Sequence, residues 1–351
     1  KNISINSKTI KKNDVFFAIK GERVDGNKFA SEALKNNSSL VIVNKINKNY
    51  TTTKQIKVKN TLSFLTKCSS IFRENTNAKI ISITGSCGKT TLKEMIGLTL
   101  KSISKTSYSP KSFNNRYGVP LSLFNLKQND KFGVFEVGMD KKGEIDNLTK
   151  IIKPDLGIIT NISYAHAKNF KNINKIAEAK AEIMNNIKKG GAIVLNMDDH
   201  FYDFHKNIAF KKKLRTITFG IYNKSSMIKL YKISKLKNKY ELFIRIQGLF
   251  ISFYSSNINK SHLYNILATV ASLSSLINLK KLKKNIFLNF QTPDGRGDIS
   301  KIKVKNKKIF LVDETYNSNP LSLKTALENY DKIEIKDSKK YLILGDMLEL
   351  G

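Results

Sequence analysis

A glycine-rich loop between an apolar segment and an amphipathic segment constrains this chain most strongly. Residues 80–83 are mostly isoleucine, which predicts a buried strand. After the loop, apolar residues recur at three- and four-residue spacing as far as Ile103, which predicts a helix with one apolar face. A strand, a glycine loop, Lys-Thr and a helix together form a phosphate-binding loop, because backbone N–H groups at a helix N-terminus hold phosphate oxygens. In such a loop Lys89 contacts the terminal phosphates and the Thr90 hydroxyl meets Mg²⁺.

The loop has the short pattern G-x-x-G-K-T, because Ile83 stands where the longer pattern has its first glycine. The alternative is a glycine turn with an incidental lysine, which leaves the Lys-Thr-Thr at a helix start unexplained. We therefore expect the whole loop to bind phosphate. Its residues are Gly85, Ser86, Cys87, Gly88, Lys89, Thr90 and Thr91.

Length and composition limit the classes of protein to which this chain can belong. The chain of 351 residues is too long for one ordinary core. It has no apolar run of membrane-spanning length and no secretory signal, so we expect no membrane insertion. Two cysteines, Cys68 and Cys87, build no disulfide framework, which favours the reducing cytoplasm. The net charge of +34 comes mostly from dispersed lysines, so we expect a solvated surface rather than a nucleic-acid partner.

The order of apolar segments predicts an α/β fold in three parts. Residues 1–78 form a small α/β module, and residues 79–300 alternate strands and helices around a parallel sheet with a hairpin at 239–254. Residues 301–351 begin a β-α-β unit with strands at 309–312 and 341–344. That unit is too small to bury a core, so we expect the rest of a third domain beyond residue 351.

Lys180 is an unusual residue for its position. It stands in the middle of the apolar stripe of a helix predicted over 173–187. Burial favours the neutral amine, which is a nucleophile and can react with CO₂ to give a carbamate that binds metal. The alternative is a lysine that extends to the edge of the stripe and remains solvated.

Three further side chains are candidates for phosphoryl-transfer chemistry. Glu136 lies in a predicted buried strand, where binding Mg²⁺ would satisfy its carboxylate. His166 follows a predicted strand end, as a metal ligand or as a polar cap. Arg296 lies in a glycine-rich hinge, where it either reaches a phosphate or remains in solvent. Thr90, Glu136 and His166 together would make a metal centre.

The chain resembles the Mur ligases, the ATP-dependent amide-forming enzymes of peptidoglycan synthesis. The segments that carry the resemblance are TGSCGKTT, SFNNRYGVPLSL, FEVGM, NISYAHAKNF, IAEAKAEI, NMDD, PDGRGD, DETYNSNP and LGDMLELG. They occur in the family's order over nearly the whole chain. The resemblance implies an N-terminal domain that binds a UDP-linked substrate, a central ATPase domain and a Rossmann-like C-terminal domain.

Within this family, DETYNSNP and LGDMLELG are most similar to the members that join D-alanyl-D-alanine to UDP-N-acetylmuramoyl-tripeptide through an acyl phosphate. Members that add the third peptide residue carry a DNPR-type motif instead. The alternatives are such a third-residue ligase, a folylpolyglutamate-type ligase, or a nucleic-acid-binding NTPase of a different class. The resemblance implies a cytoplasmic enzyme, and we expect it to be a monomer.

The resemblance also implies roles for individual residues. Catalytic roles fall to Lys89, His166, Lys180 as its carbamate, and Arg296. Mg²⁺, in two sites, is assigned to Thr90, Glu136, His166 and Lys180. ATP contacts are residues 85–91, Asn265 at adenine, Arg296 at the phosphates and Asp313 at the ribose. Substrate contacts are Ser7, Asp25, Gly26, Asn114, Asn115, Asn317 and Asn319. Two departures are Lys8, where the family has Arg, and His262, where the family has Asn.

Overall fold

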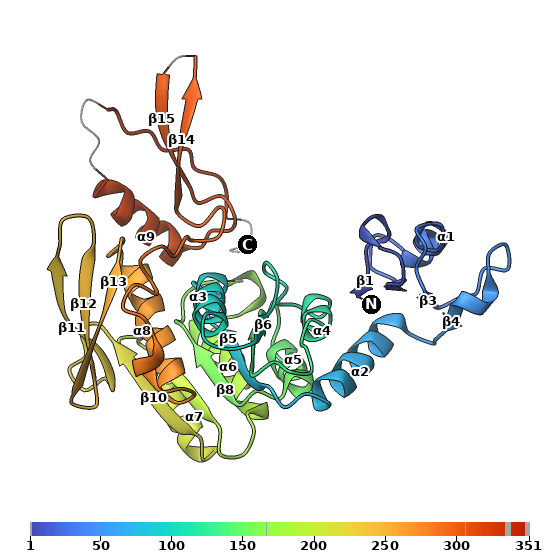
Figure 1. Cartoon of the computed structure of the whole chain (residues 1–351), viewed down its shortest axis with the longest axis horizontal. Coiled ribbons are helices and arrows are strands. Elements are labelled where there is room, and N and C mark those ends of the chain that lie inside the picture. The colour runs from blue at the N-terminus through green and yellow to red at the C-terminus, as the bar shows by residue number, and fades with distance from the viewer. Residues whose placement is uncertain (1, 166, 306, 334–337, 348–351) are drawn as a thin grey trace.

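The computed structural model describes residues 2–165, 167–305, 307–333 and 338–347. Its strands form a four-stranded, a nine-stranded and a two-stranded sheet in chain order. Figure 1 shows the corresponding parts, with the C-terminal part above the central one and the N-terminal part to its right. The α/β class predicted from the sequence is confirmed.

The N-terminal sheet is entirely parallel, in the order β1-β2-β3-β4. Its strands are β1 (Ile3–Ser4), β2 (Val15–Phe17), β3 (Leu40–Val43) and β4 (Gln55–Lys57), and helix α1 (Ala30–Lys35) precedes β3. The residues of β2 and β3 are apolar runs, which are typical of buried strands. The other two strands are too short and too polar to stand out in the sequence.

The central sheet is mixed rather than purely parallel, which corrects the sequence prediction. Its order is β13-β12-β11-β10-β9-β8-β5-β7-β6, with antiparallel pairing at β11-β12-β13. The predicted hairpin is present, but it extends the edge of the same sheet. The strands are β5 (Lys79–Thr84), β6 (Thr106–Tyr108), β7 (Phe132–Glu136), β8 (Leu156–Ile159), β9 (Ala192–Asn196), β10 (Arg215–Gly220), β11 (Ile228–Lys235), β12 (Tyr240–Ile246) and β13 (Leu249–Ser255).

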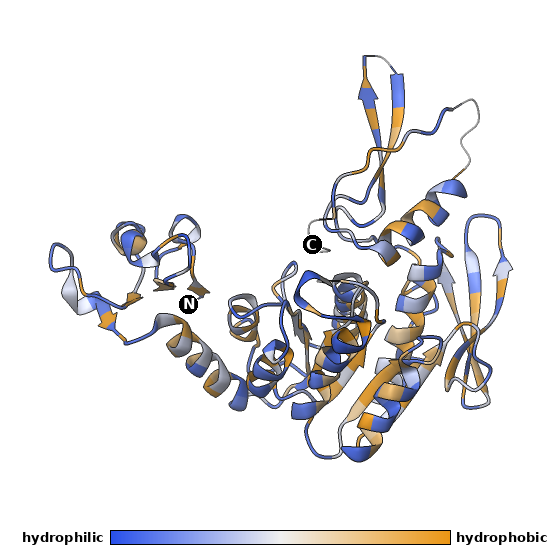
Figure 2. Cartoon of the chain, turned by 180° about the vertical axis from the view of Figure 1, so that it is seen from behind, coloured by the Kyte–Doolittle hydropathy of each residue, from blue (hydrophilic) through white to orange (hydrophobic). Residues whose placement is uncertain are grey.

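Helices cover both faces of this sheet. Ile81 and Ile83 of β5 lie in the core beneath α3 and α8, whereas Ile80 faces the opposite core. This alternation follows from the two-residue period of a strand, and Figure 2 shows hydrophobic strands between the helices. The helices are α3 (Lys89–Lys101), α4 (Gly118–Leu123), α5 (Glu144–Ile152), α6 (Ile173–Ala181), α7 (Tyr202–Lys211) and α8 (Lys260–Ser274).

Helix α2 (Thr61–Glu74) joins the N-terminal sheet to the central part (Figure 1). Its Leu65 packs with Phe17 and Ile42 of the N-terminal sheet. At its other end the buried Arg73 guanidinium donates to the carbonyls of Ile152 at 2.8 Å, Lys153 at 3.2 Å and Thr76 at 3.2 Å. The side chain of Arg73 therefore anchors the connecting helix to the central sheet.

The C-terminal segment differs from the predicted β-α-β unit. Strands β14 (Asp298–Val304) and β15 (Lys307–Asp313) form an antiparallel hairpin, and helix α9 (Pro320–Asp331) follows. The strand predicted at 341–344 is wrong, since those residues are exposed and irregular. A strand needs a paired neighbour for its backbone groups, and β14 and β15 pair with each other. The expected boundary after residue 300 falls inside β14.

No helix in the described part of the chain combines the length and the hydropathy that a bilayer crossing requires.

We expect Arg73→Met to lower the free energy of unfolding by about 3 kcal/mol, because three carbonyls lose their donor and Asp155 loses its ion-pair partner. Urea unfolding followed by circular dichroism measures this, since the chain has no tryptophan. Lys67→Met, at an exposed position of the same helix, is the control. Equal stability of the two variants would show that Arg73 is not an anchor.

Candidate active site

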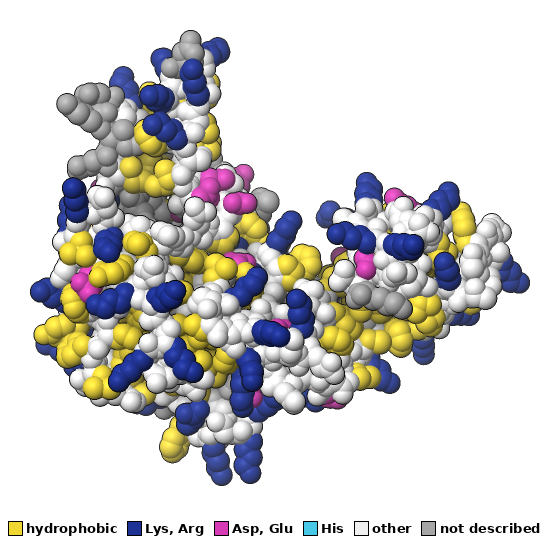
Figure 3. Space-filling model, in the orientation of Figure 1, with side chains coloured by type: hydrophobic (Ala, Val, Ile, Leu, Met, Phe, Trp, Pro, Cys, Tyr) yellow, Lys and Arg dark blue, Asp and Glu magenta, His cyan; other side chains and the backbone are white. Residues whose placement is uncertain are grey.

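A cleft with a volume of about 1160 Å³ lies between the central sheet and the C-terminal segment. Residues that follow β5, β7, β8 and β9 line it, and so do the start of α8 and residues 292–333. Ligands bind at this edge of parallel sheets because the strand ends leave a crevice there. Lys and Arg side chains are spread over the face shown in Figure 3.

The glycine loop after β5 adopts conformations that require glycine. Gly85 has φ 145°, and a Cβ on it would lie 1.8 Å from Thr160 Oγ1. Gly88 has φ 80° and precedes the first residue of α3. Lys89 Nζ lies over the loop, 2.9 Å from the Gly85 carbonyl oxygen. The predicted phosphate-binding loop is therefore formed, with its lysine at the start of a helix.

Segment 160–163 after β8 holds this loop in place. Cys87 N donates to Asn161 Oδ1 at 2.9 Å, and Ser86 Oγ donates to the Ser163 carbonyl at 2.9 Å. Thr160 Oγ1 donates to the Cys87 carbonyl at 2.7 Å. The two strand ends thus form one rigid wall of the cleft.

A buried carboxylate lies beside the loop. Glu136, the last residue of β7, is only 1% exposed. It accepts from Thr90 Oγ1 at 2.8 Å and from Asn114 Nδ2 at 2.7 Å. Within the described residues no group of three or more His, Cys, Asp or Glu side chains could hold a metal ion. A hydroxyl and a carboxylate nevertheless fit Mg²⁺, which takes few protein oxygens and completes its shell with phosphate and water.

Lys180 is 1% exposed, as its position in the apolar stripe predicted. Its Nζ donates to the Gly85 carbonyl at 3.0 Å, so its amine reaches the phosphate loop. The helix that carries it is shorter than predicted, because α6 ends at Ala181 and the 3₁₀ helix η5 (Glu182–Asn186) follows. His166 lies outside the described residues.

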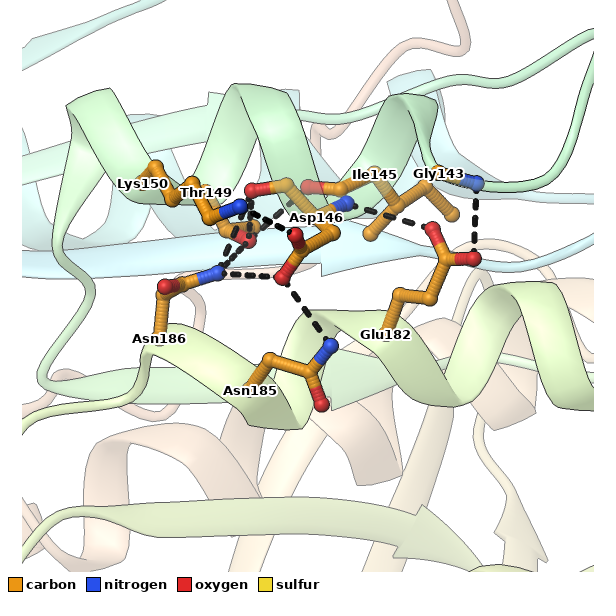
Figure 4. A network of polar contacts seen from close by, with 8 residues as sticks. All are labelled: Gly143, Ile145, Asp146, Thr149, Lys150, Glu182, Asn185 and Asn186. Atoms are coloured by element: carbon orange, nitrogen blue, oxygen red, sulfur yellow. Dashed lines mark hydrogen bonds and ion pairs between the residues drawn. The ribbon is translucent and has the colours of Figure 1, made fainter.

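The η5 segment is bound to the start of α5 through a polar network (Figure 4). Glu182 accepts from Gly143 N at 2.7 Å and from Asp146 N at 3.2 Å, which satisfies the first amides of α5. Asn185 and Asn186 donate to Asp146 Oδ1, each at 2.9 Å. Burial raises the pKa of Glu182. The network ties the segment after Lys180 to the segment after Glu136. The sequence analysis missed Glu182, although it lies within the IAEAKAEI motif.

The C-terminal segment contacts the central part across the cleft. Arg296 Nη2 donates to Ser112 Oγ at 3.3 Å, and its guanidinium lies 4.0 Å from the centre of the Tyr316 ring. Asn319 Nδ2 donates to Cys87 Sγ at 3.1 Å. Arg296, Asn317 and Asn319 therefore all line the cleft, as do Asn114 and Asn115.

Hydrogen bonds continue from Arg296 to Glu136. Thr90 has one hydroxyl proton, and Glu136 accepts it. The 3.4 Å contact between Ser112 Oγ and Thr90 Oγ1 must therefore use the proton of Ser112. Arg296 thus donates to Ser112, Ser112 to Thr90, and Thr90 to Glu136. Ser112, within the SFNNRYGVPLSL segment, is a site residue that the sequence analysis did not single out.

The far end of the cleft is formed by the start of α8. Asn265 lines the cleft, with its Oδ1 3.4 Å from where a Cβ on Gly88 would stand. His262 is buried, which lowers its pKa to about 4, and its Nε2 lies 3.1 Å from Ser255 Oγ. At neutral pH this imidazole is uncharged. Asp198, within the NMDD segment, accepts from Ile221 N at 2.6 Å and from Tyr264 Oη at 3.0 Å.

Several predicted ligand contacts do not line this cleft. Ser7 Oγ donates to Glu32 at 2.6 Å inside the N-terminal part. Asp25 accepts from Asn27 N at 2.9 Å, and Gly26 follows it. Asp313 is solvated and accepts from Thr315, which lowers its pKa. Their predicted binding roles thus have no support from the geometry of the cleft.

Comparison with known proteins gives matches over most of the chain. Residues 83–273 match the Mur ligase middle domain, and residues 1–73 match the catalytic domain of the Mur ligase family. The UDP-N-acetylmuramoyl-tripeptide–D-alanyl-D-alanine ligase of Rickettsia prowazekii is 33% identical over 350 residues, which are 99% of this chain and 76% of that protein.

Two solved structures are similar as well. MurF from Acinetobacter baumannii has a TM-score of 0.84 at 27% identity, over 95% of this chain and 72% of that one. The MurF ligase of Thermotoga maritima in complex with ADP has a TM-score of 0.80 at 27% identity, over 95% of this chain and 75% of that one. The resemblance found in the sequence is confirmed: the chain belongs to the Mur ligase family.

Proposed function

We propose that the chain joins D-alanyl-D-alanine to UDP-N-acetylmuramoyl-tripeptide with hydrolysis of ATP to ADP and phosphate. The supporting relatives carry this activity in their names and align with nearly the whole chain. One structural observation carries the proposal: Lys89, the Thr90–Glu136 pair, Lys180 and Arg296 converge on a single cleft. We place the reaction in the cytoplasm and expect a monomer.

The chemistry begins with activation of a carboxylate. The terminal carboxylate of the tripeptide attacks the γ-phosphorus of ATP, ADP leaves, and an acyl phosphate results. The amine of D-alanyl-D-alanine then attacks the carbonyl carbon, loses a proton and expels phosphate. Charge neutralisation and positioning supply most of the acceleration in such transfers. Lys89 and Arg296 are the cations at the two sides of the cleft that would supply it.

Thr90 and Glu136 would hold Mg²⁺, with His166 and the carbamate of Lys180 at a second site. The metal ion supplies charge neutralisation at the phosphate oxygens when it is bound. Thr90 and Glu136 are held ready for that role by Asn114 and Ser112.

The burial of Lys180 supports the proposal that it is carbamylated. An amine with little access to water is biased towards its neutral form, whose lone pair can attack CO₂ with loss of a proton. The product would place an anionic oxygen ligand next to Gly85, whose carbonyl already contacts Nζ.

We also propose contacts between further residues and the substrates. Ser7, Asp25 and Gly26 would bind the uridine nucleotide in the N-terminal part, and Asn317 and Asn319 would contact the acceptor side. Asn265 would bind the adenine of ATP. Asp313 would reach the ribose only if the C-terminal segment moved, since it does not line the cleft.

We expect phosphate release from ATP to require UDP-N-acetylmuramoyl-tripeptide, and continuous turnover to require D-alanyl-D-alanine as well. A colorimetric phosphate assay with mass spectrometry of the peptide product measures both. A nucleic-acid-dependent NTPase is the competing class, so duplex DNA serves as the control. Phosphate release that was independent of both ligase substrates but increased with DNA would reject the ligase and favour the nucleic-acid-dependent NTPase.

We expect Lys89→Ala to lower ATP-dependent turnover by at least about 100-fold, because one preorganised donor to the phosphates is lost. Lys101→Ala, at the exposed end of the same helix, is the control and should leave turnover unchanged. Activity of Lys89→Ala near that of the control would remove the phosphate-loop assignment.

We expect Lys180→Ala to be inactive, and short carboxylates such as acetate or formate to restore part of the activity by replacing the carbamate. Turnover is measured with increasing carboxylate concentration. Lys175→Ala, at a solvated position on α6, should need no such addition. Full activity of Lys180→Ala without carboxylate would contradict the carbamate.

A further inference from the structure

Helix α3 carries a second lysine one turn after Lys89. The side chain of Lys93 is 0% exposed, and it does not line the cleft. Full burial of a lysine is rare unless the ammonium is paired. Lys93 Nζ donates to the Ser109 carbonyl at 2.6 Å and to the Lys111 carbonyl at 2.6 Å, and it lies 2.7 Å from Glu94 Oε1. Each of the three N–H groups of the ammonium thus has an acceptor.

Two of these acceptors belong to the β6–α4 loop, residues 109–117. Lys111 has φ 46°, a left-handed conformation that residues other than glycine seldom adopt. A loop holds such a conformation only where its surroundings compensate for it. The bonds from Lys93 to the carbonyls on both sides of residue 110 provide that compensation from inside the protein.

The same loop contacts the candidate catalytic groups on its other side. Ser109 Oγ accepts from Glu136 N at 3.3 Å, and Asn114 Nδ2 donates to Glu136 Oε1 at 2.7 Å. Ser112 Oγ lies 3.4 Å from Thr90 Oγ1 and accepts from Arg296 at 3.3 Å. The loop is therefore the element through which the phosphate loop, β7 and the C-terminal segment meet.

We propose that Lys93 is a positioning residue for the ligase reaction. Its buried ammonium sets the β6–α4 loop relative to α3, and the loop in turn orients Thr90 and Glu136 towards the metal ion and Arg296 towards the phosphates. Lys89 and Lys93 lie on the same helix and have different roles. Lys89 faces the ligand, whereas Lys93 fixes the position of the β6–α4 loop. This inference rests on the proposed function.

The test compares Lys93→Met with Lys101→Met at the exposed end of the same helix. We expect Lys93→Met to lower kcat by about 10- to 100-fold, since a misplacement near 1 Å costs that much. The Mg²⁺ concentration for half-maximal activity should rise several-fold, whereas the KM for D-alanyl-D-alanine should stay unchanged. A purely structural role would lower the melting temperature and leave the Mg²⁺ dependence of the folded enzyme unchanged.

A second variant keeps the test valid if Lys93→Met does not fold. Lys93→Gln keeps two N–H donors and should show the same changes to a smaller extent. Combining a Lys93 variant with Ser112→Ala should be less than additive in kcat, because both act through one loop. A folded Lys93 variant with the wild-type kcat and Mg²⁺ dependence would overturn the inference.

Binding of Mg·ADP, followed by calorimetry, separates this inference from the proposed function. If the wild type binds Mg·ADP but does not ligate, the function proposal fails while the Lys93 variants still test the loop. We then expect the Lys93 variants to bind Mg·ADP several-fold more weakly than Lys101→Met. Equal affinity of the variants would reject the positioning role.

Discussion

The carbonyl of Gly85 is the contact on which the rest of the site depends. It accepts from Lys89 at 2.9 Å and from Lys180 at 3.0 Å, so two lysine side chains from different helices meet one peptide group. Thr160 occupies the space where any side chain at residue 85 would lie. The end of β5, the start of α3, the end of β8 and the last turn of α6 are thereby held at fixed distances around the phosphate loop.

Buried charges organise the walls of the cleft, and each described one has partners that offset its desolvation. Glu136 has Thr90 and Asn114, and Lys93, which supports the β6–α4 loop, has two carbonyls and Glu94. An unpaired charge at such positions would be expensive, so these contacts specify one arrangement of the loops. Buried residues of the central domain therefore fix the geometry of the active site.

The cleft is completed by segments from outside the central sheet. Arg296 reaches Ser112 from the segment before β14, and Glu22 of the N-terminal part lies 3.5 Å from Arg116. Both contacts are made to the β6–α4 loop, and neither is enclosed by a hydrophobic core. Movement of the outer parts would therefore act on the catalytic groups through this loop, and movement of the C-terminal segment would also act on the phosphate loop through the contact of Asn319 with Cys87.

The sequence by itself predicted the phosphate loop, the burial of Glu136 and the family, because glycine spacing, apolar runs and short motifs are local signals. It left open whether Lys180 is buried or solvated. It predicted a parallel central sheet where the structure has a mixed one, and it placed a strand wrongly at 341–344, since pairing is decided by neighbours distant in the chain. Only the tertiary structure showed that Ser112 links Arg296 to Thr90, that Glu182 ties α5 to the Lys180 segment, and that Lys93 supports the β6–α4 loop. These roles depend on which backbone carbonyls and amides come within hydrogen-bond distance after folding, and no residue pattern records that.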